Sequence, residues 1–212
     1  PNSTKTELEC YIRDYLTEHT GHTFEQTVEH CQSCETDEQL KKQIEQYRFS
    51  ETNLTSHYRK ELMRTLLEAK IDIHVYGNGW DRTGLDSYPN FHLHPPVSFE
   101  EGLNLMSQSK ILLNHMAWFK HGSSERIFNA MAQGAVCATD SSRYLDDILK
   151  DGINCLTYSL SDICPISQTD IANKIIAILS APDSWLQMTE KGKSTAAEHT
   201  WQKHLRCAII NK

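Results

Sequence analysis

The chain has 212 residues, of which 39% are hydrophobic and 23% charged, and its formal net charge is −7. This composition is ordinary for a soluble globular protein, and no apolar stretch approaches the roughly 20 residues that a membrane-spanning helix needs. The acidic balance and the absence of a Lys/Arg stripe argue against a nucleic-acid partner, because binding a phosphate backbone depends on concentrated positive charge.

The seven cysteines favour reduced thiols over a disulfide framework, since their number is odd and most stand alone in apolar or helical surroundings. No basic segment followed by an apolar one opens the chain, so we predict a cytoplasmic protein without an export signal. Pro1 stands where an initiator Met is usual, which indicates a piece of a longer protein.

Residues 1–54 are predicted to form a helical appendage to the rest of the chain or a segment between two domains. Apolar residues recur there at helical spacing in two runs, and Gly21 is expected to end the first helix. The two runs are Leu8, Ile12, Tyr15 and Leu16, and Leu40, Ile44 and Tyr47. We assign no chemistry to this segment.

Residues 55–212 show alternating helix and strand patterns, as in one α/β domain. Strands that are separated by single helices cannot pair as hairpins and must lie parallel, which predicts a doubly wound parallel sheet of about five strands. The strands are expected at 71–76, 91–94, 110–114, 135–139 and 154–158. Helices are expected at 55–69, 99–106, 124–133, 143–150 and 169–180, from 182 onward, and at 200–211.

Two loops follow predicted strands at the carboxyl end, where open parallel sheets bind their ligands. The first is Gly77-Asn78-Gly79-Trp80, after the strand at 71–76. Its glycines allow positive φ or a close backbone approach, and Trp80 can cover an apolar ring of a ligand. The alternative is a simple turn out of the strand with a packed Trp.

The second loop leads from the strand at 110–114 to the helix at 124–133. Ser123 or Ser124 can cap this helix, whose free amides and dipole suit a diphosphate. Gly122 removes the steric barrier to the approach of such a ligand.

Charged side chains of the second loop add to this predicted anion site. Lys120 and Arg126 supply positive charge, and Arg126 can grip two oxygens at once. Glu125 accepts hydrogen bonds and suits sugar or ribose hydroxyls. His115, directly after the strand at 110–114, is a further candidate for a phosphate or sugar contact. The alternative for the loop is a capped helix with a solvated Glu-Arg pair.

The run GSSERIFNAMAQGA at 122–135, placed between Ile111-Leu-Leu-Asn114 and Thr139-Asp140, is the most specific motif of the chain. With it, residues 58–205 resemble the C-terminal domain of GT-B-fold glycosyltransferases. The similarity is greatest to the group that includes spore-maturation proteins and many uncharacterised bacterial transferases. Later matches to that group are Tyr144-Leu145, Asp151 to Tyr158, and Glu198 to Trp201.

This resemblance implies a Rossmann-like domain that binds a nucleoside-diphosphate sugar at the two loops described above. It implies no separate cofactor, since the sugar nucleotide is itself the donor substrate. The general base of an inverting enzyme would lie in an N-terminal acceptor domain that this chain lacks. The chain is therefore expected to be the donor-binding half of a hexosyltransferase-like enzyme, inactive alone, whose partners are the sugar nucleotide and the missing domain.

The chain departs from the family pattern at two places. The second Glu of a Glu-x7-Glu pair, which holds ribose hydroxyls in the broader superfamily, is Asn129 here. An amide still hydrogen-bonds a hydroxyl but lacks charge, so Glu125 is the alternative for that contact. The strand that opens such a domain is also expected before the helix at 55–69, yet residues 46–54 show no strand pattern, which predicts a sheet one strand short.

Other readings of the sequence stay open beside the transferase. His30-Cys31-x2-Cys34, with His19 and His22 upstream, has the residue types of a zinc site, but a single CxxC is weak and we predict no metal. Asn129 favours a non-catalytic nucleotide-binding or interaction module with the same fold. A third possibility is a helical interaction protein in which residues 1–50 recruit a partner.

Overall fold

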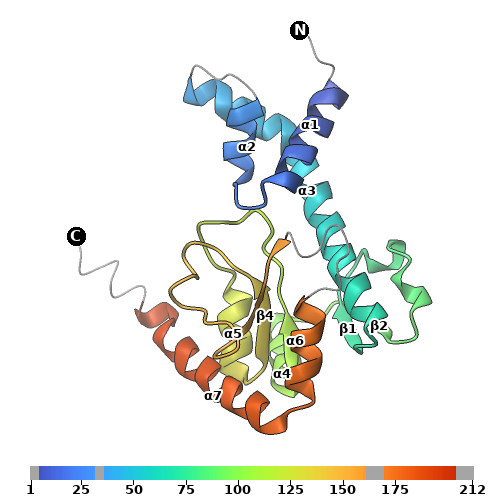
Figure 1. Ribbon diagram of the computed structural model, residues 1–212, viewed down its shortest axis with the longest axis vertical. Helices are drawn as coiled ribbons and strands as arrows, with labels where there is room; N and C mark the ends of the chain where they lie inside the picture. The colour runs from blue at the N-terminus through green and yellow to red at the C-terminus, as the bar shows by residue number, and fades with distance from the viewer. Residues whose placement is uncertain (1–4, 32–35, 161–169, 204–212) are drawn as a thin grey trace.

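The computed structural model describes residues 5–31, 36–160 and 170–203. The chain opens with three helices, α1 (Lys5–Glu18), α2 (Phe24–Cys31) and α3 (Asp37–Glu68), which pack on one another (Figure 1). The helical pattern expected for this segment is confirmed, and α1 ends before Gly21. The Thr36 side chain caps α3 by accepting from the Gln39 amide.

Helix α3 runs for 32 residues and passes through position 54, where we placed the end of the helical appendage. Its buried side chains face two ways. Tyr58, Leu62 and Leu66 enter the main core, whereas Met63 and Leu67 pack on a smaller cluster beneath the first two strands. The helix therefore connects the N-terminal helices and the α/β part through buried contacts, and the boundary at residue 54 stays a prediction.

All five expected strands are present, and every pair is parallel, which confirms the α/β class. They form two separate ladders in the described part of the chain. β1 (Ile73–Tyr76) pairs with β2 (Phe91–His94). β3 (Ile111–Leu113), β4 (Val136–Asp140) and β5 (Leu156–Tyr158) form the second ladder, in the order β3-β4-β5.

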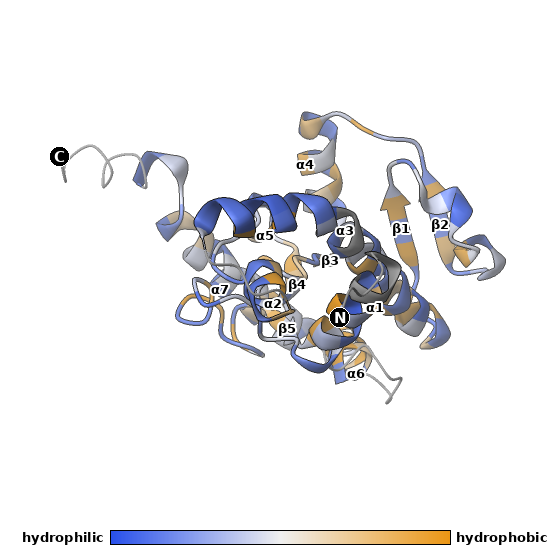
Figure 2. Ribbon diagram, turned by 90° about the horizontal axis from the view of Figure 1, so that it is seen from above, coloured by the Kyte–Doolittle hydropathy of each residue, from blue (hydrophilic) through white to orange (hydrophobic). Residues whose placement is uncertain are grey.

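The absent opening strand gives a physical reason for this division. In the common doubly wound order 3-2-1-4-5-6, the first strand lies between the second and the fourth. If β1 and β3 correspond to the second and fourth strands, a missing first strand separates them. Residues 46–54, which showed no strand pattern, lie within α3. Both views show β1 and β2 apart from the other three strands (Figures 1 and 2).

Four further helices accompany the strands, α4 (Phe99–Gln108), α5 (Glu125–Gln133), α6 (Asp170–Leu179) and α7 (Pro182–Glu198). Short 3-10 turns at Trp80–Arg82 (η1) and Leu85–Ser87 (η2) join β1 to β2. Gly134 ends α5 in the left-handed conformation, with φ of 89°, as its position after the helix predicts. The helix expected at 200–211 lies largely outside the described residues.

The helix expected at 143–150 is wrong, because this segment forms successive turns. Leu145 and Leu149 are both buried, and their spacing of four produces the helical pattern in the sequence. The backbone bonds, however, converge on two carbonyls: Ser142 accepts from residues 145 and 146, and Leu145 accepts from residues 148 and 149. A continuous helix would instead use a new carbonyl for each residue.

The main apolar core is continuous from the N-terminal helices into the α/β part. It joins Ile12, Leu16 and Phe24 of the first helices to β4, β5 and α6. No helix in the described ranges is long and apolar enough to cross a membrane.

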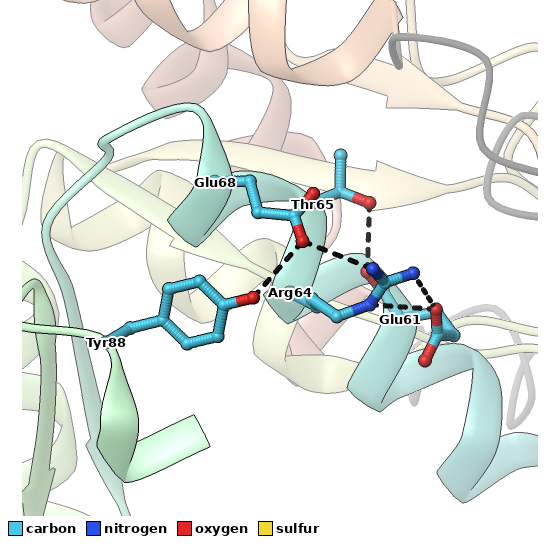
Figure 3. A network of polar contacts seen from close by, with 5 residues as sticks. All are labelled: Glu61, Arg64, Thr65, Glu68 and Tyr88. Carbon is cyan, nitrogen blue, oxygen red and sulfur yellow. Dashed lines mark hydrogen bonds and ion pairs between the residues drawn. The ribbon is translucent and has the colours of Figure 1, made fainter. Parts of the chain in front are cut away.

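A polar network fixes the end of α3 to the segment before β2 (Figure 3). Arg64 donates to the carboxylates of Glu61 and Glu68, and the Tyr88 hydroxyl donates to the same Glu68 oxygen at 3.1 Å. Its carboxylate partners raise the pKa of Arg64, so the guanidinium stays charged. The network adds a long-range contact between α3 and the β1–β2 ladder.

Candidate functional site

The start of α5 lies beside the carboxyl end of β3. Ser124 is the N-cap, as one of the two expected candidates, and its Oγ accepts from the Arg126 amide at 3.3 Å. Its carbonyl accepts from the Ile127 amide. Ser124 thus satisfies two amides of the first turn, so fewer are free for a ligand than the sequence alone suggests. The positive end of the helix dipole is unaffected.

Arg126 reaches from the first turn of α5 to the end of β3. Its Nη1 lies 3.4 Å from Oδ1 of Asn114, which is fully buried and donates from Nδ2 to the Thr139 hydroxyl at 2.9 Å. Within the described residues, neither Arg126 nor Lys120 has a carboxylate within ion-pair distance. Both positive charges are therefore available to an anion at this end of the sheet.

Lys120 is partly buried, and its ammonium lies 5.7 Å from the centre of the Trp118 ring. Burial lowers the pKa of Lys120, and the nearby Asp140 carboxylate opposes that shift. The backbone holds the loop in place, since the Lys120 carbonyl accepts from the Arg143 amide at 2.9 Å and Ser142 Oγ donates to the Gly122 carbonyl at 2.6 Å. The loops after β3 and β4 are thus joined.

His115 is held as a neutral imidazole. Burial, followed by the charges of Arg59 and Lys120, lowers its pKa to about 4. The Tyr158 hydroxyl donates to the Asn114 carbonyl at 2.7 Å, so its oxygen is left to accept from His115 Nδ1, 3.2 Å away. Nε2 is then the unprotonated nitrogen, buried and without a partner among the described residues. In this tautomer Nε2 can accept a hydrogen bond from a ligand hydroxyl, whereas phosphate oxygens are themselves acceptors and would find no donor there.

Asp140 ends β4 with a side chain that is 1% exposed. Its Oδ1 accepts from the Met116 amide at 2.7 Å and so holds the turn in which Ala117 adopts a positive φ of 50°, an uncommon conformation for a residue with a side chain. Burial raises the pKa of Asp140 to about 6, against the lowering effect of the Met116 amide. Its Oδ2 has no hydrogen-bond partner within the described residues.

The space that Gly122 leaves is not open to a ligand. A Cβ at this position would clash with the Phe119 ring, which covers the glycine. The expectation that Gly122 clears the way for a ligand therefore needs correction, since Gly122 makes room for Phe119. The ring itself is 55% exposed to solvent.

The other residues predicted on this loop lie near the start of α5. Ser123 Oγ donates to the Ser124 carbonyl at 3.2 Å. Glu125 is exposed and Asn129 is half-buried. They stand four residues apart and therefore share a face of α5.

The Gly77–Trp80 loop has the backbone that its glycines predict, with φ of 137° at Gly77 and 88° at Gly79. Asn78 is exposed. Trp80 packs with its ring centre 6.4 Å from that of Phe91, in the cluster beneath β1 and β2. The packed-Trp alternative thus describes this side chain. Both views place the β1–β2 ladder apart from α5 (Figures 1 and 2).

The residues considered for zinc surround an aromatic ring. His19 and His30 lie 4.1 and 4.4 Å from the Tyr15 ring, measured between centres, and Tyr15 OH is 3.4 Å from Nδ1 of His22. No group of three or more His, Cys, Asp or Glu in the described ranges is arranged to hold a metal ion. Cys34 lies outside these ranges.

Asn114, Asp140, Tyr158 and Arg59 were not predicted as site residues. Asn114 and Asp140 carry a usable signal, because each is a polar residue at the end of an apolar strand, where it reaches the ligand edge of a parallel sheet. Tyr158 and Arg59 come from other parts of the chain, and no local pattern indicates their approach.

This parallel α/β fold, with polar side chains gathered at the carboxyl ends of its strands, is that of the GT-B glycosyltransferases. The family model described as "Glycosyl transferase-like" matches residues 51–208. The match spans well over half of the chain, so the chain belongs to this family. No curated protein matches it at a significant level.

Solved structures with the same fold include three transferases. Sucrose-phosphate synthase from Thermosynechococcus elongatus matches with a TM-score of 0.57 and 16% identity, over 72% of this chain and 42% of that chain. A glycosyltransferase from Rickettsia africae gives 0.57 and 14%, over 72% and 43%. TarM gives 0.53 and 15%, over 71% and 31%. The chain thus spans less than half the length of each.

Proposed function

We propose that the chain is the donor-binding half of a glycosyltransferase and that it holds a nucleoside-diphosphate sugar where β3 meets α5. The supporting observation is that Arg126, which reaches Asn114 at the end of β3, and Lys120, on the loop between β3 and α5, have no carboxylate within ion-pair distance among the described residues. The positive end of the α5 dipole adds to them. A diphosphate is the anion that such an arrangement suits, and the family is one of sugar transferases.

In the proposed reaction, negative charge develops on the leaving diphosphate as the sugar departs. Cations that are already in position stabilise this charge, and Arg126 can do so in bidentate fashion. Glu125, Asn129 and the unprotonated Nε2 of His115 are the proposed acceptors for ribose or sugar hydroxyls. A ligand can approach Ser123 and Gly122 only if the Phe119 ring moves aside.

We further propose that the chain alone binds the donor without transferring the sugar. The proposed sugar is a hexose. An acceptor hydroxyl needs its own binding surface and, in an inverting reaction, a general base. The chain aligns with less than half of each solved neighbour, so these functions are assigned to an acceptor domain beyond the 212 residues. The Gly77–Trp80 loop is left out of the proposed site because Trp80 is packed.

Isothermal titration calorimetry with UDP, GDP, dTDP and CMP tests the donor site. One of the four is expected to bind, and Arg126→Ala should weaken that binding about 10- to 100-fold, the effect of losing a charge-assisted contact. Arg13→Ala is the matched control, because Arg13 is exposed on α1 and pairs with its neighbour Asp14. Equal affinity in wild type and Arg126→Ala would contradict the proposed site.

A second candidate is a non-catalytic module of the same fold, which the uncharged Asn129 favours. Such a module would bind none of the four nucleotides at millimolar concentration. In that case Asn129→Glu is the informative variant, since restored binding would identify the lost charge as the cause.

A further inference from the structure

A pocket of about 290 Å³ lies between the N-terminal helices and the carboxyl ends of β4 and β5. The turn at Thr20 and Gly21, between α1 and α2, forms one wall. The residues that follow β4 and β5 form the other, together with Lys120. Figure 1 shows the α1–α2 turn reaching the loops at this end of the sheet. The pocket shares Lys120 with the proposed donor site, but neither Arg126 nor Asn114 lines it.

One residue that lines the pocket carries a buried acceptor without a partner. Asp140 lines the pocket and is 1% exposed, and its Oδ2 has no hydrogen-bond partner within the described residues. Its other oxygen already holds the Met116 amide. A buried carboxylate oxygen left without a donor is costly, so this oxygen indicates a ligand that supplies a hydrogen-bond donor at this position.

The charges around the pocket indicate the class of that ligand. Lys120 and Arg143 oppose Asp140 and Asp146, so the charged side chains balance. A phosphate would meet two carboxylates here. A sugar hydroxyl can donate to Asp140 and accept from Lys120 at once. Ser141 and Ser142 donate their hydroxyls to Asp146 and to the Gly122 carbonyl, so their oxygens are left to a ligand as acceptors. A neutral ligand with several hydroxyls fits this mixture of donors and acceptors.

We infer that this pocket binds a sugar ring through its hydroxyls, with Asp140 Oδ2 accepting from one hydroxyl and the Thr20–Gly21 turn closing over the ring. The inference rests on the proposed function only in taking a sugar as the substrate class. It gives the N-terminal helices a role in ligand binding, because the turn between α1 and α2 supplies a wall of the site.

The test is a titration of the 212-residue chain, labelled with ¹⁵N, with methyl glycosides of glucose, galactose and N-acetylglucosamine, followed by NMR. At least one glycoside should give saturable shifts at Gly21 and the Asp140–Arg143 loop. Asp140→Asn, which keeps an acceptor for the Met116 amide, should weaken binding about tenfold or more. Gly21→Trp should abolish it by filling the pocket.

Gly21→Trp is a suitable second variant, because the backbone φ of Gly21 is not positive and nothing lies within 4 Å of a Cβ built there. Gly102→Leu on α4 is its matched control, also with free space around the Cβ, and should bind as wild type does. Inorganic phosphate should leave the same amides unshifted. Shifts outside the pocket, unchanged affinity in both pocket variants, or saturable phosphate binding there would overturn the inference.

The donor site and the pocket can fail separately. If a nucleotide binds through Arg126 but no glycoside binds, the pocket assignment is wrong and the donor site stands. If a glycoside binds and is lost in Gly21→Trp while no nucleotide binds, the pocket stands and the donor site is wrong.

Discussion

Asp140 and His115 are buried at the same end of the sheet, and their ionisation affects folding in opposite directions. Burial raises the pKa of Asp140 from 3.8 to about 6 and lowers that of His115 from 6.5 to about 4. The contribution of Asp140 to stability is therefore present below pH 3.8 and is lost as pH rises through 6. That of His115 is present above pH 6.5 and is lost as pH falls through 4.

These two effects should nearly cancel in the wild type between pH 4 and 6.5, since each corresponds to at most about 3 kcal/mol. Single variants should separate them. In Asp140→Asn, the free energy of unfolding should fall on acidification relative to wild type, because the His115 effect is left alone. In His115→Gln it should fall instead as pH rises from 4 to 6. Urea unfolding at several pH values measures both slopes.

Asp14→Asn provides the control for this experiment, because Asp14 is exposed on α1 and its carboxylate pairs only with the neighbouring Arg13 in the described contacts. It should keep the wild-type profile. The prediction is wrong if Asp140→Asn and His115→Gln also keep that profile, or if their slopes have the same sign.

Local sequence was informative about single residues where the contact is local. Ser123 or Ser124 was expected as a helix cap from its position alone, and Ser124 is the cap. The contacts that complete the site are different in kind. Arg126 meets Asn114 twelve residues away, and Asp140 meets Met116 twenty-four residues away. Such pairs depend on the order of the strands in the sheet. The spacing of residues along the chain does not determine this order.

At the level of elements, the strands were predictable because each is a short run, mostly apolar or alternating, that turn residues bound and that is too short for a helix. The segment 143–150 was not, since buried leucines four apart fit either a helix or successive turns. The sequence did indicate the absent opening strand at 46–54. It did not reveal that α3 would occupy those residues as one uninterrupted helix.

The division of the sheet leaves one edge of β1 without a strand partner in the described part of the chain. The amides of Ile73 and Gly77 donate toward β2, to the carbonyl of Asn90 just before it at 2.9 Å and to that of His94 at 3.2 Å. In a parallel ladder, alternate residues face opposite edges, so the amides of His74 and Tyr76 point away from β2. Both residues are exposed.

Native-state hydrogen exchange should therefore alternate along β1. We expect the amides of His74 and Tyr76 to exchange about tenfold or more faster than those of Ile73 and Gly77, because no backbone bond must open first. NMR-detected exchange measures all four in one sample. Equal protection of the four amides would mean that something pairs with this edge of β1, and the division of the sheet would not hold in solution.

At the level of the whole molecule, the N-terminal helices and the α/β part can form one cooperative folding unit or two. The core is continuous between them, and α3 carries buried side chains for both. Proteins with one shared core unfold in a single transition, whereas separate domains unfold in two. The structure thus favours one cooperative unit, with residues 1–54 as an integral part.

Leu16→Ala tests this, because Leu16 is fully buried in α1, far along the chain from the strands. The truncation should cost about 2–5 kcal/mol, as for other buried leucines, and should lower the stability of the whole chain. The comparison variant is Leu62→Ala, on the part of α3 that packs against the α/β core.

Urea unfolding is followed by circular dichroism and by Trp fluorescence, to which the buried Trp118 contributes from the α/β part. Both variants should shift both signals together. If Leu16→Ala leaves the fluorescence transition in place while Leu62→Ala moves it, the N-terminal helices are a separate unit, and a boundary near residue 54 becomes the better description.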